Sequence, residues 1–288
     1  MFLTIFTPTY NRADTLPQLY ASLRRQTCQD FEWVVVDDGS TDDTPQLLAA
    51  WQAEGKLPLR IHRQANAGKM AAHNQGAALA EGDMLICVDS DDCLADRAVE
   101  ALLAEYKSLP PECVGMLALK VQADDTPVTI LADKAVTVST LKAAYERHGL
   151  SGDAALVFRS SVLKEHAFPA FPGEKFVPEN YLYDQLDQEG PLRILREGLY
   201  ICQYRPDGYT ARIAHTLYSN PQGYFAYITQ RLRLDDAAVS RFLDSVRYVA
   251  MAIAHRWPLR ASPRPLWAYA ALLPGYLLYL RRYRRFRA

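Results

Sequence analysis

The sequence predicts an α/β fold: a doubly wound, mostly parallel sheet flanked by helices, with a helical, basic and amphipathic C-terminal tail. Three observations predict it. Apolar and helix-like segments alternate over the first ninety residues, polar clusters follow three of the apolar segments, and arginines gather at the C-terminus. At 288 residues, the chain has room for one large domain and an appendage.

The first four apolar segments are predicted strands, because β-branched, aromatic and leucine side chains dominate them. They are Phe2–Thr7, Trp33–Val36, Leu59–His62 and Met84–Val88. Helices are predicted between them, after Asp14, after Thr41 and over Ala71–Ala80. This order gives parallel strands with right-handed crossovers, and such sheets bind ligands at the carboxyl ends of their strands.

The pattern is looser after Asp92. Strands are expected at Val114–Val121 and Ala155–Phe158, with a hairpin from Leu192–Leu195 and Leu199–Tyr204. Helices are expected over 97–106, 139–147, 180–186, 223–234 and 237–255. Because no linker or repeat interrupts the chain, we expect one main domain over 1–220 and a helical region over 221–288, which ends in the tail 263–288.

The formal net charge of −1 excludes a generally basic nucleic-acid binder, but it hides an asymmetry. Eight arginines and no acidic residue lie from Arg256 onward. Of 32 basic residues, 24 therefore remain in 1–255 against 33 acidic ones, which is a net charge of −9. A basic appendage on an acidic body favours contact with an anionic surface.

The tail is apolar as well as basic, which favours a membrane over a nucleic acid. Trp267–Leu280 is apolar but only 14 residues long, too short to span a bilayer. Aromatic side chains recur at helical spacing on one predicted face: Tyr276, Tyr279, Tyr283 and Phe286. Such a helix lies on anionic lipid. The alternatives are a helix that packs on the protein's own acidic body and one that forms an oligomer interface.

The cysteine pattern points to a cellular compartment. Five cysteines, an odd number without zinc-binding spacing, favour a reducing environment. No basic leader precedes the first apolar run, so no signal peptide is expected. Together with the tail, these features predict a cytoplasmic protein at the inner face of the cell membrane.

The most informative polar cluster is Asp89-Ser90-Asp91-Asp92, directly after the fourth strand. Three carboxylates within four residues repel one another, and hard oxygen ligands suit Mg²⁺ or Mn²⁺ bound together with substrate phosphates. The alternative is a helix cap in a solvated loop.

The other clusters offer groups that suit a nucleotide. Asp38, before Gly39, either accepts hydrogen bonds from a base or ribose, or belongs to a tight turn. Tyr10 offers a ring for base stacking, and Arg12 and Lys69 offer charge to phosphates. The alternatives for these three are a turn and surface cations.

In combination, the motifs resemble those of glycosyltransferase family 2, whose catalytic domain has the GT-A fold. The matching segments are PTYNR (8–12), VVVDDGSTDDT (34–44), NAGKMAAHNQG (66–76) and EGDMLICVDSDD (81–92). A later segment, FPGEKFVPEN (171–180), resembles the acceptor side of members from bacterial polysaccharide synthesis. The resemblance divides 1–220 into a nucleotide-sugar-binding half, 1–100, and an acceptor half, 101–220.

The resemblance also implies site residues. Those for a nucleotide sugar, expected to be UDP-linked, are Pro8, Tyr10, Arg12, Asp38, Lys69, Asp89 and Asp91. Asp91 is the implied ligand of Mn²⁺ or Mg²⁺, with Asp92 as a close alternative. Further candidates for donor or acceptor contact are Asp184, Arg205 and Asp207. Glu179 matches the catalytic base, although the family usually has a Glu-Asp pair where this chain has Glu179-Asn180.

The implied reaction is an inverting sugar transfer to a hydroxyl of a glycan or lipid-linked acceptor, in polysaccharide or cell-envelope synthesis. An oligomer is compatible with this reading, and no nucleic-acid partner is expected. Two other functions stay open: a nucleotidyltransferase acting on a sugar phosphate, and a non-catalytic membrane-associated scaffold. A haloacid-dehalogenase-type phosphatase fits less well, because its nucleophile follows the first strand whereas Asp89 follows the fourth.

Overall fold

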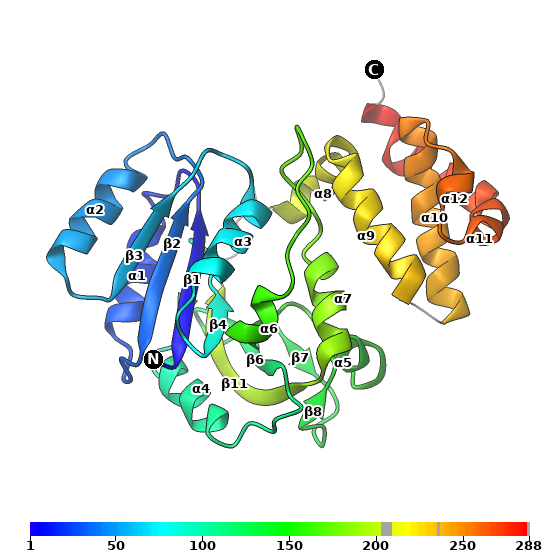
Figure 1. Cartoon of the computed structure of the whole chain (residues 1–288). Coiled ribbons are helices and arrows are strands. Elements are labelled where there is room, and N and C mark those ends of the chain that lie inside the picture. Colours follow the sequence, from blue (N-terminus) through cyan, green and yellow to red (C-terminus); the bar gives the residue numbers. More distant parts are fainter. Residues whose placement is uncertain (203–208, 235–236, 287–288) are drawn as a thin grey trace. The chain divides into compact units, whose positions relative to one another are not determined.

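The computed structural model describes residues 1–202, 209–234 and 237–286, which form two compact units (Figure 1). Over these residues, the first unit is 1–167 with 185–202, and the second is 168–184 with 209–286. The limits differ from the predicted division at residue 220, because 168–184 and 209–220 fold with the C-terminal helices. The functional division into a catalytic domain and a tail stays a prediction.

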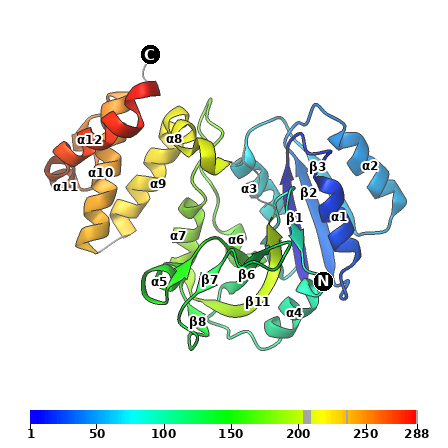
Figure 2. The same ribbon diagram turned by 180° about the vertical axis from the view of Figure 1, so that it is seen from behind.

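The sheet of the first unit begins with four parallel strands in the order β3-β2-β1-β4. Their bounds are β1 Leu3–Thr9, β2 Phe31–Asp37, β3 Leu59–Arg63 and β4 Met84–Cys87. The crossover helices are α1 Leu16–Arg24, α2 Thr44–Glu54 and α3 Lys69–Leu79. Figures 1 and 2, which view the chain from opposite sides, show α1 and α3 on the two faces of these strands. The predicted doubly wound sheet is thus confirmed.

Strand sequence explains this arrangement. Every residue of β1 and β2 is buried, as expected for parallel strands covered on both faces. Leu19 of α1 shares the main core with Ile5 and Trp33. The next residue of β1, Phe6, points to the opposite face and meets the ring of His73 from α3. Packing on both faces therefore holds the carboxyl ends of the strands at one edge.

Further strands extend the sheet in the order β4-β10-β6-β11-β5, and β8 also pairs with β11. β10 is antiparallel to both β4 and β6, whereas β11 is parallel to β6. The bounds are β5 Cys93–Leu94, β6 Gly115–Gln122, β8 Val138–Ser139, β10 Ala154–Arg159 and β11 Leu192–Cys202. A separate two-stranded sheet pairs β7 Ile130–Leu131 with β9 Leu150–Ser151. The helices here are α4 Ala98–Tyr106, α5 Leu141–Arg147, α6 Ser160–Lys164 and α7 Asn180–Glu189.

The predicted hairpin between Leu192 and Tyr204 is wrong for the residues that the structure describes. One strand, β11, runs from Leu192 to Cys202 and pairs with β6, with shifts of register between Ile194 and Tyr200. The polar residues Arg196 and Glu197 are exposed in this irregular stretch. A β-bulge and a turn share this composition, which explains the error.

The second unit is helical. Its helices are α8 Tyr209–Ser219, α9 Pro221–Leu234, α10 Ala238–His255, α11 Pro265–Ala270 and α12 Leu272–Arg282, with 3₁₀ turns at Leu259–Ala261 and Arg284–Phe286. α10 contacts α9 as well as α11 and α12 (Figure 1). A Cβ at Gly275 of α12 would lie 2.5 Å from Cγ1 of Val249 on α10, so this glycine permits the close approach. No helix in 1–202, 209–234 or 237–286 is long and apolar enough to cross a membrane.

The tail packs differently from the prediction. Tyr279 and Tyr283 are only 5% and 1% exposed, and they join Tyr224 and Tyr248 in the core of the second unit. Tyr276, by contrast, is 45% exposed. The prediction of one aromatic face turned toward lipid is therefore wrong for Tyr279 and Tyr283, because burying these large rings against α9 and α10 stabilises the helical unit.

Candidate active site

The polar clusters that follow β1 and β2 are joined by hydrogen bonds at the carboxyl ends of these strands. The Asn11 backbone N–H donates to the Ser40 hydroxyl at 2.9 Å, and the Asn11 side-chain oxygen accepts from the Thr41 N–H at 2.8 Å. The Arg12 N–H donates to the Thr44 hydroxyl at 2.9 Å. Tyr10 is 46% exposed beside this fixed turn, while Pro8 is buried at the end of β1. The Tyr10 ring and the Arg12 guanidinium are thus attached to a backbone turn that these hydrogen bonds hold in place.

Asp37 and Asp38 have different partners. Asp37 accepts from the Ser40 N–H at 2.8 Å and closes its own turn. Asp38 accepts three hydrogen bonds of 2.8 Å from the loop before α3: from the Gln64 amide, the Ala67 N–H and the Gly68 N–H. Both carboxylates are buried. Asp38 therefore joins the second cluster to the start of α3.

Gly39 makes this junction possible. Its φ of +79° lies in the left-handed region, and a Cβ there would lie 3.0 Å from the Asn66 backbone nitrogen. The glycine is thus required both for the turn and for the close approach of the loop that carries Lys69.

Lys69 and Asp89 form an ion pair at the same edge. The Lys69 ammonium, at the start of α3, lies 2.8 and 3.1 Å from the two carboxylate oxygens of Asp89. Burial opposes ionisation of Asp89, but Lys69, Lys120 and Arg12 outweigh it and keep its pKa below the ordinary value. Because the Asp89 side chain is 37% exposed, a ligand can reach this charged pair.

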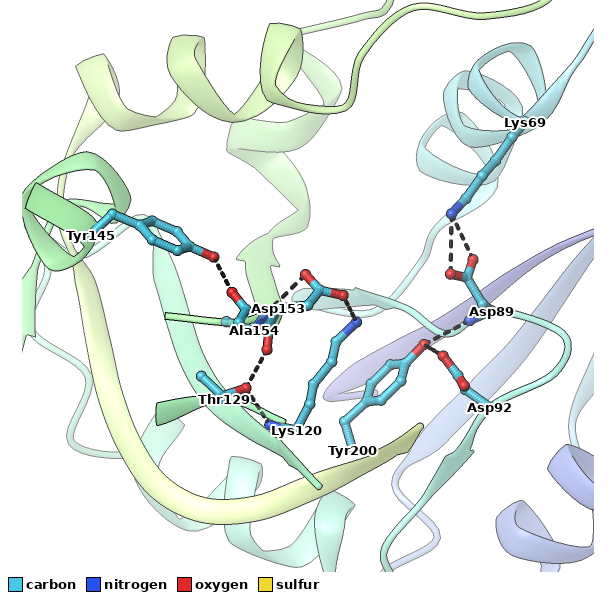
Figure 3. Close-up of polar contacts among 10 residues, drawn as sticks. Lys69, Asp89, Asp92, Lys120, Thr129, Tyr145, Asp153, Ala154 and Tyr200 are labelled. Carbon is cyan, nitrogen blue, oxygen red and sulfur yellow. Dashed lines mark hydrogen bonds and ion pairs between the residues drawn. The ribbon is translucent and has the colours of Figure 1, made fainter. Parts of the chain in front are cut away.

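Tyr200 contacts the turn after β4 at two residues, Asp89 and Asp92 (Figure 3). The Tyr200 hydroxyl from β11 accepts from the Asp89 N–H at 3.0 Å and donates to Asp92 Oδ2 at 2.8 Å. Burial, Asp89 and Asp92 raise the pKa of Tyr200 well above its ordinary value, so it remains a donor. Asp91 is half-buried, and its carboxylate makes no hydrogen bond or ion pair with another described residue. Asp91 is thus the carboxylate best placed to accept a new partner.

Lys120 of β6 supports Tyr200 from the other side, as Figure 3 shows. Its ammonium lies 4.2 Å from the Tyr200 ring centroid and 2.6 Å from Asp153 Oδ2. Burial opposes the charge of Lys120, but Asp153 and then Asp89 raise its pKa. The predictions did not include Lys120, Asp153 or Tyr200. One signal was present: a lysine inside the otherwise apolar strand GMLALKVQ.

The predictions also did not include His73, although it lies in the motif 66–76. It follows Lys69 by one turn of α3 and is 9% exposed. Burial and then Lys69 lower its pKa to about 4, against a smaller opposing effect of Asp89. His73 is therefore neutral at pH 7.

The predicted residues after position 168 fall in the second unit or outside the described residues. Glu179 is half-buried at the start of α7, where its carbonyl accepts from the Leu182 N–H at 3.0 Å. Asp184 lies 3.5 Å from the Arg231 guanidinium, which also holds the buried Asp244 at 2.8 Å. This gives Asp184 a packing role, and its contact with a donor or acceptor stays a prediction. Arg205 and Asp207 lie outside the described residues.

The residues present fit a site for a divalent cation whose coordination is completed by the substrate. No three His, Cys, Asp or Glu side chains converge on one point in the part of the chain that the structure describes. Mg²⁺ and Mn²⁺ sites in nucleotide-binding enzymes often use one or two carboxylates and take their other ligands from phosphates and water. Asp91 fits this type of site, because its carboxylate has no partner in 1–202, 209–234 or 237–286 and it lies two residues from Asp89.

A model of the glycosyl transferase family 2 matches residues 4–164. This is more than half of the chain, and it includes the three polar clusters that follow β1, β2 and β4. The chain belongs to glycosyltransferase family 2. A "PGL/p-HBAD biosynthesis glycosyltransferase" from Mycobacterium bovis is 39% identical over 103 residues, which is 36% of this chain and 40% of that protein. The glycosyltransferase GlyG of Streptococcus pneumoniae is 28% identical over 112 residues, 39% of this chain and 37% of GlyG. The chain thus spans less than half the length of these two relatives.

Solved structures show the same fold. TarS of S. aureus, in complex with UDP-GlcNAc, has a TM-score of 0.63 at 18% identity and covers 100% of this chain and 93% of its own. The mannosyltransferase PcManGT of Pyrobaculum calidifontis, in complex with GDP-Man and Mn²⁺, has a TM-score of 0.58 at 18% identity. The match covers 96% of this chain and 86% of PcManGT. These neighbours are GT-A glycosyltransferases, which confirms the predicted GT-A fold of this family 2 member.

Proposed function

We propose that this chain is an inverting, metal-dependent glycosyltransferase. It moves a sugar from a nucleotide sugar, expected to be UDP-linked, to a hydroxyl acceptor. One observation carries the proposal. The ion pair of Lys69 with Asp89 lies at the carboxyl edge of the parallel strands, and Asp91 follows in the same turn, in a chain of glycosyltransferase family 2. Family relatives supply the reaction class, and the site supplies groups for a charged donor.

The donor diphosphate meets two cations in this proposal. Lys69 pairs with Asp89, and Arg12 is close enough to lower the pKa of the same carboxyl group. Tyr10 stacks on the base from its rigid turn, and Pro8 and Asp38 shape the wall behind it. TarS with UDP-GlcNAc and PcManGT with GDP-Man support a nucleotide-sugar ligand.

Asp91 would hold the metal ion, with Asp92 in a secondary role because Tyr200 already occupies one of its oxygens. When bound, Mn²⁺ or Mg²⁺ neutralises charge that develops on the leaving diphosphate. The complex of PcManGT with Mn²⁺ supports a divalent ion in this fold.

Glu179 is the proposed catalytic base. Its carboxylate takes the proton of the acceptor hydroxyl, whose oxygen then bonds to the anomeric carbon opposite the leaving group. The bond from that carbon to the diphosphate oxygen breaks with its electron pair, so the configuration inverts. The position of Glu179 at the start of α7 supports a fixed base, as does the match to the family's acidic residue.

For the acceptor, we propose a hydroxyl of a glycan or a lipid-linked precursor in polysaccharide or cell-envelope synthesis. The place of action would be the inner face of the cell membrane, reached through the basic C-terminal region. Eight arginines without an acidic residue from Arg256 onward support an anionic surface as the partner.

Thermal unfolding with a panel of nucleotide sugars and Mn²⁺ tests the donor. UDP-GlcNAc and GDP-Man belong in the panel together with UDP-glucose and UDP-galactose. A ligand at a hundred times its Kd stabilises the native state by about 2.7 kcal/mol, so the true donor raises the melting temperature by several degrees. Identical melting temperatures with every donor, at millimolar concentration, would contradict the proposal.

A further inference from the structure

The outward face of α11 and α12 carries a continuous row of exposed apolar side chains. Its members are Leu266, Tyr269, Leu272, Leu273, Tyr276 and Leu277, with exposed fractions from 45% to 82%. They recur at spacings of three and four residues, which places them on one side of each helix. We call these six residues the outer stripe. A single exposed leucine needs no explanation, but a contiguous group of this kind marks an interaction surface.

The outer stripe is held rigidly in place by the opposite side of the same helices. Tyr279 and Tyr283 are buried in the core of the second unit, and Gly275 packs closely on Val249. Ala268 and Ala271 are fully buried against α10. The outer stripe therefore cannot turn inward without dismantling this packing.

The chain segment that carries the outer stripe has charges of one sign, because no Asp or Glu follows Asp244. The last acidic residue of the chain is Asp244, which is buried and paired with Arg231 and Arg247. Exposed arginines flank the outer stripe in the sequence at both ends: Arg264 before α11, Arg281 in the last turn of α12 and Arg284 just after it. A partner for this surface must accept apolar side chains and neutralise several cations.

We propose that the outer stripe is the membrane-docking face of the protein, lying in the headgroup region of an anionic bilayer with the flanking arginines on the lipid phosphates. This inference rests on the membrane location proposed above and names the residues that achieve it. Tyrosines beside leucines and arginines are typical of helices in this region. A second copy of the chain fits less well, because a symmetric contact would bring the same arginines together.

Cosedimentation of the full-length protein with vesicles tests the proposal. Vesicles of phosphatidylcholine with 30% phosphatidylglycerol are compared with pure phosphatidylcholine, for the wild type, Leu277→Glu and Ile130→Glu. Leu277 and Ile130 are both 56% exposed, but Ile130 lies on β7 in the first unit, so the two substitutions are matched in chemistry. Since burying a leucine is worth about tenfold in partitioning, Leu277→Glu should bind the anionic vesicles at least about tenfold more weakly, while Ile130→Glu binds as the wild type does.

A separate variant tests the contribution of the flanking arginines to vesicle binding. Arg281→Gln with Arg284→Gln should weaken binding to the anionic vesicles by about fivefold per arginine and leave the weak binding to phosphatidylcholine unchanged. Equal vesicle binding by Leu277→Glu and wild type, or no vesicle binding by the wild type, would overturn the proposal. So would a light-scattering result in which Leu277→Glu converts a dimer into a monomer without a change in vesicle binding. Stabilisation by nucleotide sugars, measured without vesicles, should be the same in all variants. A failure of the membrane-docking proposal can therefore be distinguished from a failure of the proposed glycosyltransferase activity.

Discussion

The hydroxyl of Tyr200 donates a buried hydrogen bond of 2.8 Å to the carboxylate of Asp92, 108 residues earlier in the chain. Because the same oxygen accepts from the Asp89 N–H, one side chain from β11 closes the turn that carries the acidic cluster. Asp92 thereby supports the turn, whereas the Asp91 carboxylate has no partner in the part of the chain that the structure describes.

Tyr200→Phe should therefore loosen the acidic turn. The substitution removes the hydroxyl that accepts from the Asp89 N–H and donates to Asp92, and losing these buried hydrogen bonds costs about 1–3 kcal/mol of unfolding free energy. Donor binding in Mn²⁺ should weaken as well. Urea unfolding and calorimetry with UDP measure the two effects. Tyr145→Phe is the control, because Tyr145 donates to the Gly152 carbonyl from an exposed position. Equal effects of the two substitutions on both measurements would show that Tyr200 has no special role.

Asp91→Asn should remove most metal-dependent donor binding without unfolding the protein. The carboxylate has no partner among the described residues, so its loss costs little stability. Calorimetry with UDP in Mn²⁺ should show at least a tenfold loss of affinity, and binding in EDTA should be unchanged. Asp125→Asn is a matched control on an exposed loop, at a φ of 63° that asparagine tolerates. Unchanged affinity in Asp91→Asn would remove it from the metal site.

Glu179→Gln should keep donor binding and lose turnover. A general base contributes about 10²–10⁴-fold, so kcat should fall by that factor while the UDP affinity stays the same. Glu112→Gln, an exposed residue of the first unit, is the control. Rates near those of the wild type in Glu179→Gln would assign the base to another residue.

Stability should fall as the pH drops below neutrality, in part because of His73. Its pKa is about 4 in the folded protein and 6.5 when unfolded, so between these values the unfolded state binds more protons. The contribution is fully present above pH 6.5 and is lost as the pH falls toward 4, with about 2 kcal/mol gone by pH 5. Urea unfolding at pH 7.5 and pH 5 measures it. If His73→Gln loses as much stability as the wild type over this interval, His73 is not the titrating group.

Much of the fold, and the placement of several candidate site residues, could be predicted because the information is local. Strand composition, helix signals and polar clusters after strand ends are each contained within about ten residues. Asp38, Lys69 and Asp89 consequently meet at the predicted edge. The position of β10 between β4 and β6 could not be predicted, since strand pairing across a long interval leaves no periodic signal.

The same limit explains the residues that were missed. Tyr200 and Lys120 act on the acidic turn through contacts between distant strands, and neither lies in a recognised motif. The orientation of Tyr279 and Tyr283 could not be predicted for another reason. Helical spacing shows which side chains share a face, but the packing of Tyr279 against the core decided which face stays exposed.

Product analysis tests most directly whether this chain transfers a sugar from a nucleotide sugar. The purified protein is incubated with each donor and Mn²⁺, with and without anionic vesicles and a glycan acceptor, and the released nucleotide is identified by chromatography. We predict a free nucleoside diphosphate from one donor, together with a β-linked product from an α-linked donor and no release by Asp91→Asn. Formation of pyrophosphate from a sugar phosphate and a nucleoside triphosphate, or no turnover with any donor, would contradict the account.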